Sequence, residues 1–149
     1  MSARCNVILT ETYSYKDGNG KQLTKTSKLF FYRHSDGHPK GTIPTLKRFI
    51  QIMKNGYFEN NLSNGADWLI HFGKDDNGPI FPMSYEKFGI YKHGVYEPTT
   101  EIHGHIDFLY EIDMGTAELV IKRPIYGESG KLDTWVVIDE NEKPIITES

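Results

Sequence analysis

The residues best suited to chemistry lie in one short segment, where a predicted strand gives way to a turn. The segment reads Tyr32-Arg33-His34-Ser35-Asp36-Gly37-His38-Pro39. An arginine can bind a phosphate or a carboxylate through two parallel hydrogen bonds, and a histidine can transfer a proton near neutral pH. Asp36-Gly37 favours a turn, and the neighbouring side chains could equally serve only to anchor it. The segment therefore predicts either a ligand-binding turn or a purely structural one.

A second polar segment reads Ile102-His103-Gly104-His105-Ile106-Asp107. If strand geometry begins at His103, then His103, His105 and Asp107 share one face. Two imidazoles and a carboxylate can hold zinc or another divalent metal. The spacing partly resembles the His-x-His-x-Asp of metallo-β-lactamase-fold hydrolases, although Phe108 stands where their next histidine would be. The alternative to a metal site is a strand entry whose polar face meets water.

Basic residues gather on and before a predicted helix. Lys40, Lys47, Arg48 and Lys54, together with Arg33, could form an anion-binding surface, or simply the solvated face of that helix. The sequence has no Walker A loop, dinucleotide fingerprint or nucleophile elbow. We therefore expect no cofactor, and a binding role rather than catalysis.

The first half of the chain predicts a hairpin followed by two helices. Strands over residues 6–15 and 26–33 flank Asp17-Gly18-Asn19-Gly20, a sequence that favours hairpin turns. Helical spacing predicts a helix over 44–55 with Thr42 as its cap, and the residues expected to face the core are Ile43, Leu46, Phe49, Ile50 and Met53. Residues 59–72 favour a second helix, with Ser63 and Asn64 as a later start and a short buried strand over 68–72 as the alternative.

The second half predicts an aromatic segment followed by strands. Residues 73–98 are rich in Gly and Pro and are expected to pack down and frame a binding site through Phe81, Tyr85, Phe88, Tyr91 and Tyr96. Residues 105–113 alternate as a strand, with Ile106, Phe108, Tyr110 and Ile112 on one face and His105, Asp107, Glu111 and Asp113 on the other. Further strands are expected within 117–123 and 133–139, and the polar tail 140–149 is expected to fray.

The predicted fold class is α+β: a mainly antiparallel sheet, made of an N-terminal hairpin and C-terminal strands, packed with two helices. At 149 residues we expect a single domain over 1–149. A net charge of −3 argues against duplex nucleic acid as a partner. The single cysteine, Cys5, forms no intrachain disulfide, and no apolar run has the length of a membrane helix. We expect a cytoplasmic protein with no membrane partner, and a homo-oligomer remains open.

Three segments together resemble small uncharacterised bacteriophage proteins that carry Tyr-Arg-His-x-Asp-Gly-x-Pro. They are YRHSDGHP, IPTL and GVYEPTTEIHGHIDFLYEID, and the resemblance runs from Leu29 to Asp113. The chain departs from the pattern at His38, where an aromatic residue is expected, and in a longer hairpin over 16–25. The resemblance implies an accessory protein in the host cytoplasm that blunts host defence, either by sequestering a nucleotide signal or by blocking a host protein.

The leading hypothesis is therefore a binding protein for a small anionic or nucleotide-derived ligand. The residues expected to contact this ligand are Tyr32, Arg33, His34, Asp36, His38, Tyr96, His103 and His105. Arg33, His34 and Asp36 are expected to meet the 103–107 segment in one polar concavity. The alternatives are a metal-dependent hydrolase that uses His103, His105 and Asp107, and a protein–protein inhibitor of a host defence protein.

Overall fold

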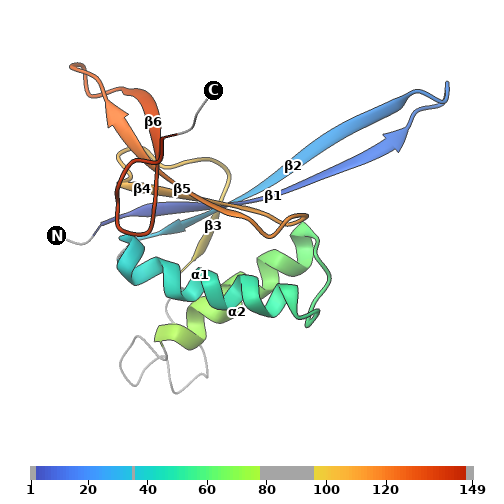
Figure 1. Ribbon diagram of the computed structural model, residues 1–149, viewed down its shortest axis with the longest axis horizontal. Helices are drawn as coiled ribbons and strands as arrows, with labels where there is room; N and C mark the ends of the chain where they lie inside the picture. Colours follow the sequence, from blue (N-terminus) through green and yellow to red (C-terminus); the bar gives the residue numbers. More distant parts are fainter. Residues whose placement is uncertain (1–2, 35, 78–95, 147–149) are drawn as a thin grey trace.

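One six-stranded sheet with two helices on one face makes up the fold (Figure 1). The computed structural model describes residues 3–34, 36–77 and 96–146, and for 71–77 the backbone alone. The elements in chain order are β1 (Cys5–Lys16), β2 (Gln22–Arg33), α1 (Pro39–Lys54), α2 (Leu62–Asn77), β3 (Glu97–Thr99), β4 (Phe108–Asp113), β5 (Leu119–Tyr126) and β6 (Leu132–Ile138). The predicted α+β fold is confirmed, and its opening hairpin is longer at both strands than expected.

The centre of the sheet is a parallel pair, β1 and β4, in the strand order β3-β2-β1-β4-β5-β6. Every other neighbouring pair is antiparallel. Parallel strands cannot be joined by a tight turn, so the chain between them must cross over, and both helices belong to that crossover. The short β3, which the sequence did not predict, pairs with the end of β2, where Phe30 lies opposite Thr99.

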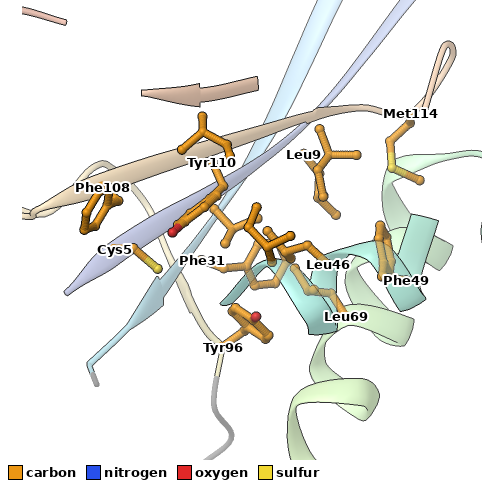
Figure 2. Packing of buried hydrophobic residues seen from close by; sticks show 14 of the residues in the cluster. Cys5, Leu9, Phe31, Leu46, Phe49, Leu69, Tyr96, Phe108, Tyr110 and Met114 are labelled. Atoms are coloured by element: carbon orange, nitrogen blue, oxygen red, sulfur yellow. The ribbon is translucent and has the colours of Figure 1, made fainter. Parts of the chain in front are cut away.

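The face of the sheet under the helices carries the main core. Side chains alternate along a strand, so Cys5, Val7 and Leu9 of β1 point to the same side and are all buried. Their partners on the neighbouring strands follow the same alternation, and residues of both helices complete the core (Figure 2). The core includes Phe31, Leu46, Phe49, Leu69, Tyr96, Phe108, Tyr110, Ile112 and Met114.

The opposite face of the sheet carries a smaller apolar cluster. Its buried members are Ile8, Tyr32, Ile106 and Leu109. The expectation that Ile106 shares a face with Phe108 is wrong, because β4 begins only at Phe108 and His105 has a φ of 59°. The alternation holds only within a strand, and the chain bends at Asp107, so Ile106 packs on the far side of the sheet from Phe108.

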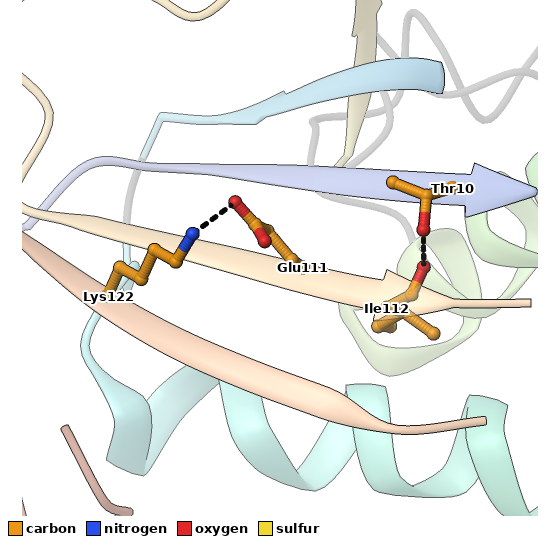
Figure 3. A network of polar contacts seen from close by, with 4 residues as sticks. All are labelled: Thr10, Glu111, Ile112 and Lys122. Atoms are coloured by element: carbon orange, nitrogen blue, oxygen red, sulfur yellow. Dashed lines mark hydrogen bonds and ion pairs between the residues drawn. The ribbon is translucent and has the colours of Figure 1, made fainter. Parts of the chain in front are cut away.

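Two polar contacts join strands around β4 (Figure 3). The Lys122 ammonium lies 3.0 Å from the Glu111 carboxylate, and this pair links β4 to β5. The Thr10 hydroxyl donates a long, 3.5 Å hydrogen bond to the carbonyl of Ile112, between β1 and β4. Both ion-pair side chains are partly solvated, so the pair adds only a modest increment to stability.

Helix α1 begins at Pro39, five residues before the predicted start, and Thr42 is not its cap. Proline suits the first helical position because its φ is already helical and it has no N–H to satisfy. Thr42 lies inside the helix, where its hydroxyl donates to the carbonyl of Asp36 (2.8 Å). The predicted inward stripe is confirmed for Ile43, Leu46, Phe49 and Met53, whereas Ile50, also predicted to face the core, is only partly buried.

Helix α2 confirms the helical interpretation of this region over the strand alternative. It starts at Leu62, because the side chain of Asn61 caps it by accepting from the N–H of Asn64 (2.9 Å). It continues to Asn77, beyond the predicted end at residue 72. Gly65 allows close packing, since a Cβ there would lie 2.7 Å from the Met114 methyl carbon. The predicted aromatic residues Phe81, Tyr85, Phe88 and Tyr91 lie outside the described residues.

The tail over residues 140–146 folds back along β6. The Asp139 carboxylate accepts from the N–H groups of Asn141 and Lys143, which closes a turn. The N–H of Ile145 then donates to Val137 (2.9 Å), so the tail pairs with β6. Lys47 of α1 forms an ion pair with Glu140 of the turn. Among the helices described, neither is long and apolar enough to cross a membrane.

Phe49→Ala should lower the free energy of unfolding by about 3–5 kcal/mol, because Phe49 is fully buried and packs against Phe58 with ring centroids 5.5 Å apart. Urea denaturation followed by circular dichroism measures the change. Lys54→Ala, on the exposed side of the same helix, is the matched control and should stay within about 0.5 kcal/mol of the parent. An equal loss in both variants would contradict the assignment of Phe49 to the core.

Stability should fall as the pH rises from about 9 to 12. Burial raises the pKa of the Cys5 thiol from 9.0 to about 12 and the pKa of Tyr96 from 10.0 to about 12, and it also raises the pKa of Tyr110. In the unfolded chain these groups ionise at their ordinary values, whereas in the folded chain they stay neutral. Ionisation therefore favours unfolding in this range, by up to about 1.4 kcal/mol per pH unit for each group.

Urea denaturation at pH 8, 9.5 and 10.5 tests this alkaline loss. Cys5→Ala removes the group with the lowest ordinary pKa of the three, so its stability should fall less steeply than that of the parent between pH 8 and 9.5. Parallel curves for the two proteins would show that the thiol does not contribute.

Candidate functional site

The two polar segments predicted from sequence meet at one end of the sheet. Cys5 at the start of β1 lies opposite Arg33 on one side and Phe108 on the other. Just before it, the N–H of Arg4 donates to the Asp107 carboxylate (3.0 Å), and the N–H of Asp107 donates to the Arg4 carbonyl (2.8 Å). The segments flank the same stretch of β1, but successive side chains point to opposite faces of the sheet and so do not form one concavity.

Arg33 points to the helix side and is only 4% exposed. Its Nη1 donates to the Tyr96 hydroxyl (3.0 Å), and its guanidinium carbon lies 5.3 Å from the centroid of that ring. Tyr96 is itself buried. The sequence placed Arg33 at the surface as a phosphate contact, whereas the structure places it inside, where it joins β2 to the residue preceding β3.

The Asp36-Gly37 turn fits closely against the start of β1. Asp36 has a φ of 57°, which aspartate tolerates better than most residues. A Cβ on Gly37 would lie 2.8 Å from the Arg4 carbonyl carbon, so only glycine fits. The N–H of Gly37 donates to Ala3 (3.0 Å), and its carbonyl accepts from the Tyr110 hydroxyl (2.7 Å). This turn has a structural role, and the Asp36 side chain remains exposed.

On the other face of the sheet, Tyr32 stacks on His103. Their ring centroids are 3.9 Å apart at an interplanar angle of 10°. The Tyr32 hydroxyl lies 3.4 Å from Nδ1 of His34. These three residues, all predicted to contact a ligand, are therefore together, and the His34 and His103 side chains are exposed.

Asn6, which was not predicted from the sequence, holds this arrangement in place. It is fully buried, its Oδ1 accepts from the N–H of His103 (2.9 Å), and its Nδ2 donates to the carbonyl of Phe31 (2.8 Å). The sequence did contain a signal, because Asn6 directly precedes the apolar run Val7–Leu9 of a predicted strand. A polar side chain that is buried with such a run requires hydrogen-bonding partners.

The proposed metal ligands are not arranged as the sequence predicted. His103, His105 and Asp107 lie before β4, and the positive φ of His105 removes the shared strand face on which the prediction rested. The Asp107 carboxylate is hydrogen-bonded to Arg4. Within the residues that the structure describes, no three His, Cys, Asp or Glu side chains are grouped to hold a metal ion.

His103 and His105 instead line a pocket of about 350 Å³, here called the imidazole pocket. Its walls are Ile102, His103, Gly104, His105, Ile106, Tyr126, Gly130, Leu132 and Trp135. The His105 and Tyr126 ring centroids are 6.0 Å apart. The Tyr126 hydroxyl donates to the carbonyl of Ile106 (2.9 Å), which fixes the β5 end of the pocket to the loop before β4. Two aromatic rings, two imidazoles and three aliphatic side chains form this lining, and none of the residues in it is acidic.

A second pocket, of about 460 Å³, shares Ile106 and Tyr126 with the first and is called the Arg123 pocket. It is lined by Ala3, His38, Ile106, Asp107, Phe108, Arg123, Pro124, Tyr126 and Glu142. Here His38 and Asp107 of the predicted set meet the half-buried Arg123 of β5. Arg123 and Trp135 were missed because each lies within an ordinary strand, where sequence spacing does not show which cavity a side chain lines.

The predicted basic surface is only partly assembled. Lys40, Lys47, Arg48 and Lys54 are exposed on α1, but Arg33 lies in the core and cannot join them. The Lys47 ammonium is paired with Glu140. The basic residues of α1 therefore form the solvated face of a helix, and a carboxylate of the tail lies beside them.

Comparison with known proteins gives no relative from which to transfer a function: no protein-family model, curated protein or solved structure matches the chain.

Asn6→Leu should lower the free energy of unfolding by about 1–3 kcal/mol, because it leaves the His103 N–H and the Phe31 carbonyl without this partner. Urea denaturation measures the loss. Thr10→Val removes a longer, partly solvated bond on the same strand and is the control, with a loss below about 1 kcal/mol. If the Asn6 variant were as stable as the Thr10 variant, Asn6 would not have the holding role assigned to it.

Proposed function

We infer that the protein is a non-catalytic binding protein for a nucleotide-derived ligand. The observation that carries this proposal is the lining of the imidazole pocket by Trp135, Tyr126 and two histidines. Flat aromatic side chains favour flat aromatic ligands, because stacking buries both faces. The volume of about 350 Å³ lies in the usual range of small-molecule pockets. A nucleobase has the required shape and offers polar edges to the two imidazoles.

The adjoining Arg123 pocket supports a phosphate as the second part of the ligand. The planar guanidinium of arginine matches two phosphate oxygens. Asp107 and Glu142 in the same lining can accept hydrogen bonds from ribose hydroxyls, and they also repel additional negative charge. The mixed lining therefore favours a ligand with a single negative charge, such as a phosphodiester, over a triphosphate, which carries several.

In the cell, we propose that such binding withholds a nucleotide signal from a host defence system. This part of the proposal rests on the resemblance to small bacteriophage proteins. It requires the ligand to be held and released unchanged, which a pocket of stacking side chains is suited to do.

Titration of tryptophan fluorescence tests the proposal. Trp68→Phe leaves Trp135 as the single tryptophan of the chain, so its emission reports directly on the imidazole pocket. The probes are the 3′,5′-cyclic monophosphates of adenosine and guanosine, AMP and ATP. We expect quenching with affinity in the order cyclic diester, monoester, triphosphate, and recovery of intact nucleotide after denaturation of the complex.

In that background, Arg123→Ala should weaken binding of the cyclic nucleotide about 10- to 100-fold, because a charge-assisted contact contributes about 1.5–3 kcal/mol. Arg123→Lys should restore only part of the affinity, since lysine cannot form two parallel bonds. Arg48→Ala, an exposed arginine on α1, is the matched control and should bind like the parent.

Several results would overturn this function. Absence of quenching by all four probes at millimolar concentration would favour the protein–protein inhibitor. Recovery of a cleaved nucleotide, with loss of that activity on chelation and in His103→Ala, would favour the metal-dependent hydrolase.

A further inference from the structure

The hairpin of β1 and β2 extends well beyond the rest of the sheet and forms a projecting arm (Figure 1). Strand β4 pairs with β1 only as far as Thr10, and β3 pairs with β2 only at Phe30–Tyr32. Residues 11–29, which we call the arm, are therefore paired only with each other among the strands of the structure. Within the described part of the chain, no other strand pairs with either outer edge of the arm, and most of its side chains are exposed.

The two faces of the arm differ in chemistry. Tyr13 and Tyr15 lie on one face, both 44% exposed, with ring centroids 6.2 Å apart. The register places Lys25 opposite Tyr13 and Leu23 opposite Tyr15 on that same face. The other face presents small hydroxyl side chains, including Thr12 and Thr26, whose oxygens are 2.9 Å apart, together with Lys16 and Lys28. One face is thus an exposed pair of aromatic rings beside a lysine.

The arm is basic although the whole chain is acidic. It contains four lysines, against Glu11 and Asp17, in a chain whose net charge is −3; the lysines are Lys16, Lys21, Lys25 and Lys28. The Asp17 carboxylate accepts from the N–H groups of Asn19 and Lys21 and closes the turn at the tip. The arm therefore complements a polyanion, whereas the rest of the chain repels one.

We propose that the arm binds single-stranded nucleic acid. Unpaired bases stack on exposed aromatic rings whatever their sequence, and two neighbouring rings offer faces to successive bases. Lys25 beside the rings and Lys21 at the tip are placed to contact the phosphates of a strand stacked on the tyrosines. A protein partner is less well matched, because lysine is depleted in the buried part of protein interfaces. This activity is separate from the two pockets at the other end of β1.

Fluorescence anisotropy of a labelled oligo(dT) of 20 nucleotides, titrated with the full chain, tests the proposal. We expect binding at 50 mM NaCl that weakens at 200 mM NaCl. Tyr13→Ala/Tyr15→Ala should weaken it at least about tenfold, and Tyr13→Phe/Tyr15→Phe should preserve it, because phenylalanine keeps the stacking face. Ser14→Ala lies between the two tyrosines but on the opposite face, so it is the matched control and should bind like the parent. Lys25→Gln should give a shallower salt dependence.

Circular dichroism and the melting temperature check that each variant is folded. We expect all variants to fold, because the substituted side chains lie on the exposed arm. No anisotropy change for the parent protein, or equal affinity of the parent and the Tyr→Ala pair, would overturn the proposal. Tighter binding of a 20-base-pair duplex than of the single strand would assign the arm to duplex grooves instead. A dimer in light scattering that dissociates in the Tyr→Ala pair, without oligonucleotide binding, would assign the aromatic face to a second copy of the chain.

Discussion

The parallel pairing of β1 with β4 is the constraint on which the rest of the molecule depends. It brings Phe108 beside Cys5 with both strands running in the same direction, while Arg33 lies on the other side of Cys5. The chain must cross over the sheet between these strands, which accounts for two helices on a single face (Figure 1). Cys5, Arg33 and Phe108 thus lie side by side across the sheet. This register also decides which side chains of the three strands enter the helix-side core and which face the pockets.

The segment Tyr32–Pro39 most resembles a ligand-binding motif. Its residues mainly build the junction at which the ends of β1, β2 and β4 meet. Arg33 is enclosed with Tyr96, Asp36 takes a left-handed conformation, and Gly37 allows the backbones to touch. A close junction and a ligand site call for the same residue types, because both need polar groups on a sharply turned backbone. The two can be separated only by burial, and His34, Asp36 and His38 of this segment are exposed to solvent.

Local patterns predicted the elements, and non-local contacts decided the site. The Asp-Gly and Asn-Gly turn and the helical spacing around Phe49 were sufficient for the hairpin and for α1, since each signal acts within a few residues. The start of β4 was misjudged because the bridge between Arg4 and Asp107 joins residues far apart in sequence. Arg123 and Trp135 escaped notice for the same reason, as their pockets are completed by the loop before β4.

The central pair also governs how the chain reaches this fold. The pairing of β1 with β2 is local and can form as soon as residue 33 is available, whereas the other edge of β1 waits for residues 108–113. Until then, Val7, Ile8 and Leu9 lie on an open strand edge, which is a template for pairing with another chain. The contact that organises the native molecule therefore makes its folding non-local and slow, and defines the interval in which nascent chains are most prone to aggregate.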